Sequence, residues 1–274
     1  MNGDPETQYV LARRTLLDAL EFLGVHRGSV ILVGAQAIYL HTGESDVAVA
    51  PFTRDADLAL DPRGLDPEPK IETILREHGY EPREHQIGVW RNPFSGGQVD
   101  FLVPEALSGA PGRRAAQLPT QGNRLARRTT GLEGVIVENE RRMISAMEPG
   151  DTRRFEIRVA GPAALLAAKL FKIDERRVNE RRLVDKDAID VLRLLRAVPT
   201  ETLRGGMERL RSDPLTRDVS DAAINQLQRL FGHPDGEGVA MAVRGLDPLE
   251  PADEIRASTP LLAKDLVAAL KRSR

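Results

Sequence analysis

The sequence predicts an α+β protein, with a small mixed sheet followed by an all-helical C-terminal part. Up to about residue 160, short apolar runs that alternate with polar residues are interspersed with helical patterns. From Ala163 onward, apolar residues recur at helical spacing to the end of the chain. Because Gly161-Pro162 separates the two patterns, we expect an α/β core at 1–160 and a helical domain at 161–274.

The elements of the first domain are expected to be short and bounded by turn residues. Helical spacing followed by glycine predicts helices at 6–23, 35–41 and 70–78. Buried or alternating apolar runs predict strands at 30–33, 55–60, 87–90, 98–103, 143–147 and 155–159. Loops are expected at 43–53, 62–69 and 92–97, and the Gly-, Pro- and Arg-rich segment 108–131 suggests an exposed or mobile stretch.

The second domain is expected to be helical throughout, and the chain has no internal repeat. The periodicity predicts helices at roughly 163–177, 183–197, 200–211, 216–231 and 259–272.

Composition limits the class of protein. The chain has 274 residues, of which 41% are hydrophobic and 29% charged, as is ordinary for a globular domain. It contains no cysteine, which excludes disulfide scaffolds, thiolate zinc sites and cysteine nucleophiles and is compatible with a reducing cytosol. No signal-peptide pattern and no apolar run of about 18 residues occurs. We therefore expect a cytoplasmic protein without a membrane span.

Positive charge comes mainly from arginine, although the formal net charge is −2. A GC-rich genome would explain this preference, and the arginines would then be scattered over solvated faces. Alternatively, the clusters form a phosphate-binding surface. The clusters are Arg113-Arg114, Arg124 with Arg127-Arg128, Arg141-Arg142, Arg153-Arg154, Arg176-Arg177 and Arg181-Arg182.

An Asp-x-Asp pair lies in the expected strand at 55–60. Side chains at i and i+2 of a strand share a face, so Asp55 and Asp57 lie about 6–7 Å apart along it. Two carboxylates at this distance repel unless a cation lies between them, and hard oxygen ligands suit Mg²⁺. Asp100, flanked by apolar residues in the strand at 98–103, is the candidate third ligand. Alternatively, the pair occurs by chance and caps a turn.

A strand that ends in glycine and opens into a helix lies upstream of the acidic pair. In the run Ile31 to Ala37, Gly34 marks the turn. Such a turn directs backbone N–H groups and a helix N-terminus toward an anion. A phosphate cradle beside paired metal ligands is the arrangement that phosphoryl or nucleotidyl transfer requires.

These motifs resemble the DNA polymerase β-type nucleotidyltransferase superfamily, and more closely its AbiEii-type and MenT-like members, which include type IV toxin–antitoxin toxins. The likeness covers about residues 28–196. It rests on four stretches in order: Val33-Gly34-Ala35-Gln36-Ala37, Thr53-Arg54-Asp55-Ala56-Asp57-Leu58, Lys169 with Asp174, and Lys186-Asp187-Ala188-Ile189-Asp190. The chain departs from the pattern at Ala35, where Gly or Ser is usual, and in a longer interval between Gly34 and Asp55. Residues 200–274 match nothing in the pattern.

The resemblance implies a nucleotidyltransferase core that uses Mg²⁺, or Mn²⁺, and a nucleoside triphosphate. It implies metal binding and catalysis by Asp55, Asp57 and Asp100. The implied nucleotide-binding residues are Gly34, Ala35, Thr53 and Lys169, and Lys169 and Asp187 are further implied catalytic residues. The implied acceptor is a tRNA 3′ end, and the implied partner is an antitoxin.

Each assignment also has an alternative that does not involve nucleotidyl transfer to tRNA. Lys169, in an apolar helical stretch, would only extend its ammonium to water. Asp187 and Asp190 would form helix-surface pairs with Arg193, and Thr53 would cap a turn. The acceptor would otherwise be a small molecule, as for aminoglycoside nucleotidyltransferases, or a protein. A nucleotide-binding pseudoenzyme is disfavoured, because all three carboxylates are present.

Overall fold

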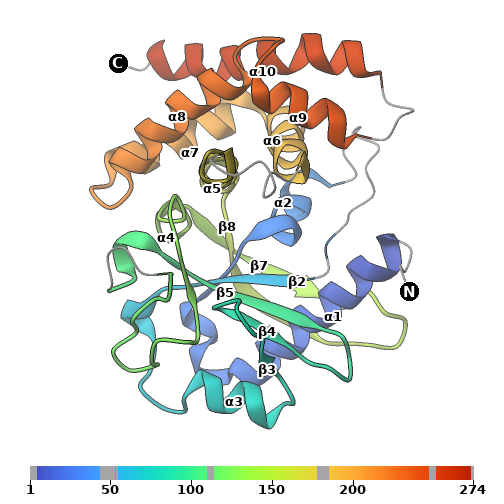
Figure 1. Cartoon of the computed structure of the whole chain (residues 1–274), viewed down its shortest axis with the longest axis vertical. Coiled ribbons are helices and arrows are strands. Elements are labelled where there is room, and N and C mark those ends of the chain that lie inside the picture. The colour runs from blue at the N-terminus through green and yellow to red at the C-terminus, as the bar shows by residue number, and fades with distance from the viewer. Residues whose placement is uncertain are drawn as a thin grey trace. The chain divides into compact units, whose positions relative to one another are not determined.

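A computed structural model describes residues 5–43, 53, 55–109, 114–177, 185–246 and 251–272 (Figure 1). Its contacts divide the chain into two compact units, which we describe separately. The first comprises Met1–Ala37, Ala50–Leu132 and Asn139–Ala160, and the second comprises Ile38–Val49, Glu133–Glu138 and Gly161–Arg274. Compactness does not establish independent folding, so domains at 1–160 and 161–274 stay a prediction.

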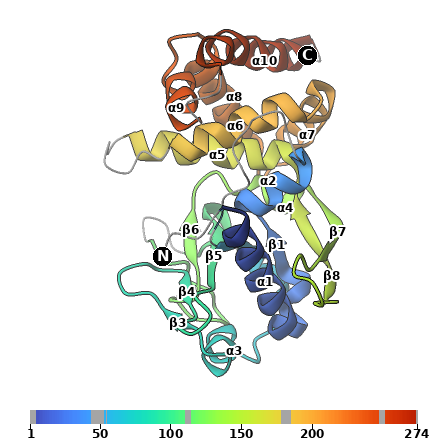
Figure 2. The same ribbon diagram turned by 90° about the vertical axis from the view of Figure 1, so that its right-hand side faces the viewer.

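The first unit is built on a mixed sheet, as expected (Figures 1 and 2). Its described strands run in the order β3-β4-β5-β2-β1-β8-β7, and β6 pairs with β5. Three pairs are parallel (β1 with β8, β2 with β5, β5 with β6), and the rest are antiparallel. The strands are β1 Val30–Leu32, β2 Asp55–Leu60, β3 Glu81–Pro82, β4 Val89–Arg91, β5 Gln98–Pro104, β6 Arg127–Thr129, β7 Asn139–Ser145 and β8 Arg154–Ala160.

Helix α1 (Pro5–Leu23) packs against the sheet, with contacts to β2, β5 and β8. It inserts Leu16, Leu17 and Leu20, none of which is exposed, into the core. This burial is the main stabilising contribution, at about 1.5–3 kcal/mol for each fully buried side chain. A shorter helix, α3 (Ile71–Glu77), also contacts α1.

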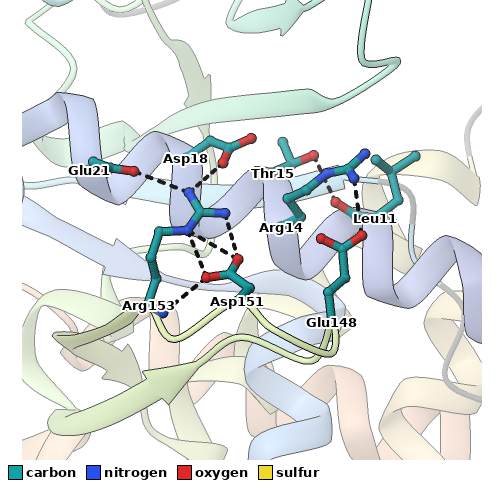
Figure 3. Close-up of polar contacts among 8 residues, drawn as sticks. All are labelled: Leu11, Arg14, Thr15, Asp18, Glu21, Glu148, Asp151 and Arg153. Atoms are coloured by element: carbon teal, nitrogen blue, oxygen red, sulfur yellow. Dashed lines mark hydrogen bonds and ion pairs between the residues drawn. The ribbon is translucent and has the colours of Figure 1, made fainter.

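Ion pairs connect α1 to the turn between β7 and β8 (Figure 3). Arg153 contacts Asp18 at 2.7 Å and Asp151 at 2.8 Å, and Arg14 contacts Glu148 at 3.0 Å. Because these side chains are partly exposed, each pair contributes at most about 1 kcal/mol. Their effect is mainly to fix the hairpin relative to α1.

The second unit is helical in its described part. Helix α2 (Gly34–Thr42) begins in the first unit, and α4 (Gly134–Val137) is a single turn. The remaining helices are α5 Pro162–Arg177, α6 Asp185–Ala197, α7 Thr200–Ser212, α8 Arg217–Phe231, α9 Glu237–Gly245 and α10 Ala252–Arg272. The predicted helical C-terminal part is therefore confirmed. No described helix is long and apolar enough to cross a membrane.

The expectation that 108–131 is an exposed stretch was wrong for several of its described residues. Leu118 is 3% exposed and Leu125 is fully buried. The indole nitrogen of Trp90 donates a hydrogen bond to the Leu125 carbonyl at 3.1 Å. β6 follows and pairs with the end of β5. Turn-rich composition hid this segment because its few apolar residues lack a regular period.

Sequence periodicity also missed α9 and placed the start of α10 too late. Helix α10 begins at Ala252 and contains Pro260, which has no N–H to continue the hydrogen-bond ladder. Burial of Ile255 and Ala263 on either side holds the helix across this point. In α9, apolar Val239 and Met241 are buried although the segment also contains glycine. The predicted loop at 43–53 lies largely outside the described residues.

Candidate active site

The three predicted carboxylates meet on one face of the sheet. β2 and β5 are parallel, and their register places Asp57 beside Asp100. One carboxylate oxygen from each of Asp55, Asp57 and Asp100 lies within 4.8 Å of the others. The alternate residues Ala56 and Leu58 are fully buried on the opposite face. The Asp-x-Asp spacing and the strand pairing therefore bring three hard oxygen ligands together.

Asp100 carries the electrostatic strain of this arrangement. Burial first, and then the negative charges of Asp57 and Asp55, together raise its pKa to about 7. The charge of Arg127 and a hydrogen bond from Gln98 (Nε2 to Oδ1, 3.0 Å) act in the opposite direction. A divalent cation would remove this repulsion, and an all-carboxylate set suits Mg²⁺ or Mn²⁺. The residues present therefore fit a metal.

Gly34, the first residue of α2, lies directly against Asp57. Its φ is +69°, and a Cβ at this position would come within 2.0 Å of Oδ2 of Asp57. The backbone N–H of Val33 also donates to the Asp57 carbonyl at 3.0 Å. The glycine of the predicted turn is therefore required by the close approach of a metal-ligand candidate.

A network of hydrogen bonds holds Asp55 in position. The Thr53 hydroxyl donates to Oδ1 of Asp55 at 2.8 Å. Nε2 of Gln36, which is 1% exposed, donates to the Asp55 carbonyl at 3.2 Å and to that of Ala12 at 3.1 Å. Nε of Arg13 in turn donates to Oε1 of Gln36 at 3.1 Å. Thr53 thus orients a carboxylate, and its contact with a phosphate stays a prediction.

Sequence reasoning missed the roles of Gln36 and Arg13. Gln36 belongs to the Gly34 motif. Its polar side chain between Ala35 and Ala37 was the sequence signal that could have indicated a role. Arg13 lies on a different helix, and nothing local to it indicated a partner. Ala35, predicted to bind nucleotide, is 4% exposed beside Gly34.

Lys169 and Asp187 form a second, buried cluster within the helical unit. Nζ of Lys169 lies 2.9 Å from Oδ1 of Asp187 and 2.6 Å from Oδ2 of Asp190. Burial opposes the charge on Lys169, but the two carboxylates raise its pKa well above the usual value. Lys172 and Arg176 also contact Asp187, at 3.4 Å and 2.6 Å.

The burial of these residues excludes the surface roles that the sequence left open for them. Lys169 is 7% exposed, so its ammonium does not reach water as a solvated head group. Asp187 and Asp190 are 2% and 1% exposed, so they are not helix-surface pairs. Asp174, five residues after Lys169, contacts Arg229 at 2.5 Å. The sequence spacing thus marked a real cluster, but its ion pairs are internal to the helical unit.

Several arginine clusters also face carboxylates of the chain itself. Arg128 pairs with Glu105, Arg141 with Glu156, Arg142 with Glu140, Arg153 with Asp151, and Arg176 with Asp187. Three others, Arg114, Arg124 and Arg127, make no ion pair with a described residue. Arg113, Arg181 and Arg182 lie outside the described residues.

A family model described as nucleotidyltransferase (NTP_transf_8) matches residues 13–203, well over half of the chain. The chain belongs to this nucleotidyltransferase family. The match spans both the acidic triad and the Lys169 cluster. A comparison with curated proteins finds no significant match. Family membership identifies the protein as a nucleotidyltransferase, and the triad is its candidate metal site.

Proposed function

We propose that the protein uses a divalent metal to transfer a nucleotide from a nucleoside triphosphate to an acceptor hydroxyl, at the 3′ end of a tRNA. One observation carries the proposal: in a nucleotidyltransferase chain, Asp55, Asp57 and Asp100 converge within 4.8 Å. Three carboxylates this close do not stabilise the fold by themselves. The charges of Asp57 and Asp55 raise the pKa of Asp100, and their mutual repulsion opposes folding when no cation neutralises it.

The reaction forms a bond between the acceptor oxygen and the α-phosphorus and breaks the bond to pyrophosphate. The acceptor hydroxyl loses its proton to solvent. Asp55, Asp57 and Asp100 would hold Mg²⁺, which when bound neutralises charge on the attacking and leaving oxygens. Thr53 and Gln36 keep Asp55 oriented through their hydrogen bonds. Gly34 leaves room for Asp57 to take its position.

We further propose that Lys169 contributes to triphosphate binding, as the family resemblance implies. For this, its ammonium must exchange one of two close carboxylates for a phosphate oxygen. Lys169→Ala should then lower kcat/KM by at least about tenfold, which corresponds to about 1.4 kcal/mol. Unchanged kinetics combined with lost stability would show that Lys169 has a purely structural role.

A tRNA acceptor is favoured by free positive charge in the unit that carries the triad. Arg114 and Arg124 are exposed, Arg127 is half-buried, and none is paired with a described carboxylate. Arginines without partners are suited to backbone phosphates. The corresponding biological proposal is a toxin whose tRNA modification arrests growth, with a separately encoded antitoxin as partner.

An acceptor panel tests the function. The protein is incubated with Mg²⁺ and each α-labelled nucleoside triphosphate, together with total tRNA, an aminoglycoside set or protein alone. Label in tRNA, absent with Asp57→Asn, supports the proposal. Label only in an aminoglycoside or in protein would reject the tRNA acceptor and retain nucleotidyl transfer. Growth on induced expression of wild type and Asp57→Asn separately tests the toxin role.

A further inference from the structure

Arg127 lies on the far side of Asp100 from Asp57. In the sheet, β5 lies between β2 and β6, and the β5–β6 register places Arg127 beside Leu102. Asp100 and Leu102 share a face because they are two residues apart. The Arg127 side chain therefore leaves the sheet on the same face as the triad. Its charge lowers the pKa of Asp100, which agrees with this placement.

The backbone of Arg127 is fixed from several sides. It pairs with β5 on one side and makes an isolated bridge with Ala115 on the other. Gly88, with φ +79°, approaches so closely that a Cβ there would lie 2.6 Å from the Arg127 nitrogen. Binding a ligand at Arg127 therefore orders only its side chain, because the backbone is already fixed.

Arg128, the next residue, is used differently. Alternation along β6 turns it to the opposite face, where it pairs with Glu105. By contrast, no carboxylate in the described part of the chain lies within ion-pairing distance of the Arg127 guanidinium. Arg128 therefore serves as a matched control for Arg127, because it forms an ion pair with a described carboxylate and Arg127 does not.

The charge balance at the site indicates what Arg127 binds. Three carboxylates surround the candidate metal position, and Arg127 adds a positive charge at its edge. If a divalent cation were held by the three carboxylates, their negative charge would be neutralised and Arg127 would have no negatively charged partner nearby among the described residues. A planar guanidinium is well suited to bind phosphate through two hydrogen bonds.

We propose that Arg127 binds a substrate phosphate on the Asp100 side of the triad. The inference rests on the proposed function, since the phosphate belongs to one of its two substrates. Gly34 lies on the β1 side of β2, whereas Arg127 lies beyond β5. If the triphosphate occupies the Gly34 side, the phosphate at Arg127 is that of the acceptor.

Binding without turnover tests this assignment. Bulk tRNA alone, and each of the four nucleoside triphosphates alone, are titrated in Mg²⁺ against wild type, Arg127→Ala, Arg127→Lys and Arg128→Ala. We expect Arg127→Ala to weaken tRNA binding about tenfold or more, with partial recovery in Arg127→Lys. Arg128→Ala should bind as wild type does. Equal melting temperatures of the Arg127 variants and wild type confirm folding, and Arg127→Gln replaces any variant that unfolds.

The outcomes separate the two sources of phosphate. A loss confined to nucleoside triphosphates would support phosphate binding by Arg127 and assign the phosphate to the nucleotide. If Arg127→Ala binds both tRNA and the nucleoside triphosphates as tightly as wild type, the proposal is overturned. Arg127 would then act only through its charge on Asp100. Since no turnover is required, a protein that binds but transfers nothing would reject the proposed function and leave the assignment of Arg127 standing.

Discussion

The carboxylate of Asp57 occupies the space that a side chain on Gly34 would need. A Cβ at Gly34 would lie 2.0 Å from Oδ2 and 2.7 Å from Cγ of Asp57, and the backbone there has φ +69°. Helix α2 therefore begins directly against a candidate metal ligand. The absence of a side chain at Gly34 therefore leaves the space that Asp57 occupies, and a role of this turn in phosphate binding stays a prediction.

Gly34→Ala should abolish nucleotidyl transfer and destabilise the protein. Backbone strain alone costs about 1–3 kcal/mol, and the new methyl group must also displace Asp57. Gly150→Ala is the matched control, since Gly150 has φ +87° and nothing within 4 Å of its Cβ position. The control should lose stability and keep its activity. Full activity in Gly34→Ala would show that the Asp57 position is not needed.

Asp57→Asn should not destabilise the protein in the absence of divalent metal, because it removes repulsion from Asp55 and Asp100. Mn²⁺ should raise the melting temperature of wild type and have little effect on the variant. Binding at 100 times Kd adds about 2.7 kcal/mol, a shift of several degrees. Thermal melts with Mn²⁺ and with EDTA measure this. Equal Mn²⁺ shifts in both proteins would place the metal elsewhere.

Lys169→Met should be strongly destabilising at neutral pH. It removes the one cation that contacts both buried carboxylates, Asp187 and Asp190. Breaking a buried ion pair by removing one partner typically costs about 3–5 kcal/mol. Lys172→Met is the control, because the Lys172 side chain is 42% exposed and should contribute little. Urea unfolding of the three proteins measures the difference. Similar losses in both variants would contradict the central place given to Lys169.

The buried ion pair between Lys169 and Asp187 predicts that stability depends on pH. Burial opposes ionisation of Asp187, but Lys169, Lys172 and Arg176 lower its pKa well below the usual value. Its contribution is therefore present above the unfolded pKa of about 3.9 and is lost as pH falls through the lower folded value. The raised pKa of Lys169 gives a contribution that is present below about pH 10.4 and lost at higher pH. The stability difference between wild type and Lys169→Met should thus be largest between about pH 4 and pH 10. A difference that does not change on acidification would contradict the ion-pair account.

Binding of tRNA should depend steeply on salt. If about six phosphates are contacted, affinity falls about a thousandfold between about 50 and 200 mM salt. Charge reversal at Arg127 should weaken binding and flatten this slope, without a comparable effect on nucleotide binding. Reversal at Arg128 would instead place a carboxylate beside Glu105 and test stability. Titration of labelled tRNA at three salt concentrations measures the slope, and a flat response would reject an RNA acceptor.

The acidic strand could be predicted from sequence because its signals are local. Alternation between acids and apolar residues defined β2 at Asp55–Leu60, and the flanking Val99 and Phe101 marked Asp100 as a mid-strand position. The sequence could not show that β2 and β5 are neighbours. That pairing depends on burial of the opposite face against α1, which joins segments far apart in the chain.

Long-range polar partners could not be predicted for the same reason. Arg13 and Gln36 are 23 residues apart and form their hydrogen bond only in the folded chain. Lys169 and Asp187 lie on successive helices, and motif spacing located both without revealing that they pair. The arginine clusters were likewise visible, but only the structure separates Arg128, paired with Glu105, from Arg127 on the triad face.

Transfer of label from differently labelled nucleotides tests the central claim most directly. Wild type and Asp57→Asn are incubated with tRNA, Mg²⁺ and the same nucleoside triphosphate labelled at either the α- or the γ-phosphate. The account predicts that wild type incorporates the α-label into tRNA and releases the γ-label as pyrophosphate. It also predicts that folded Asp57→Asn does neither. Incorporation of the γ-label, or equal transfer by both proteins, would contradict nucleotidyl transfer at the Asp55, Asp57 and Asp100 site.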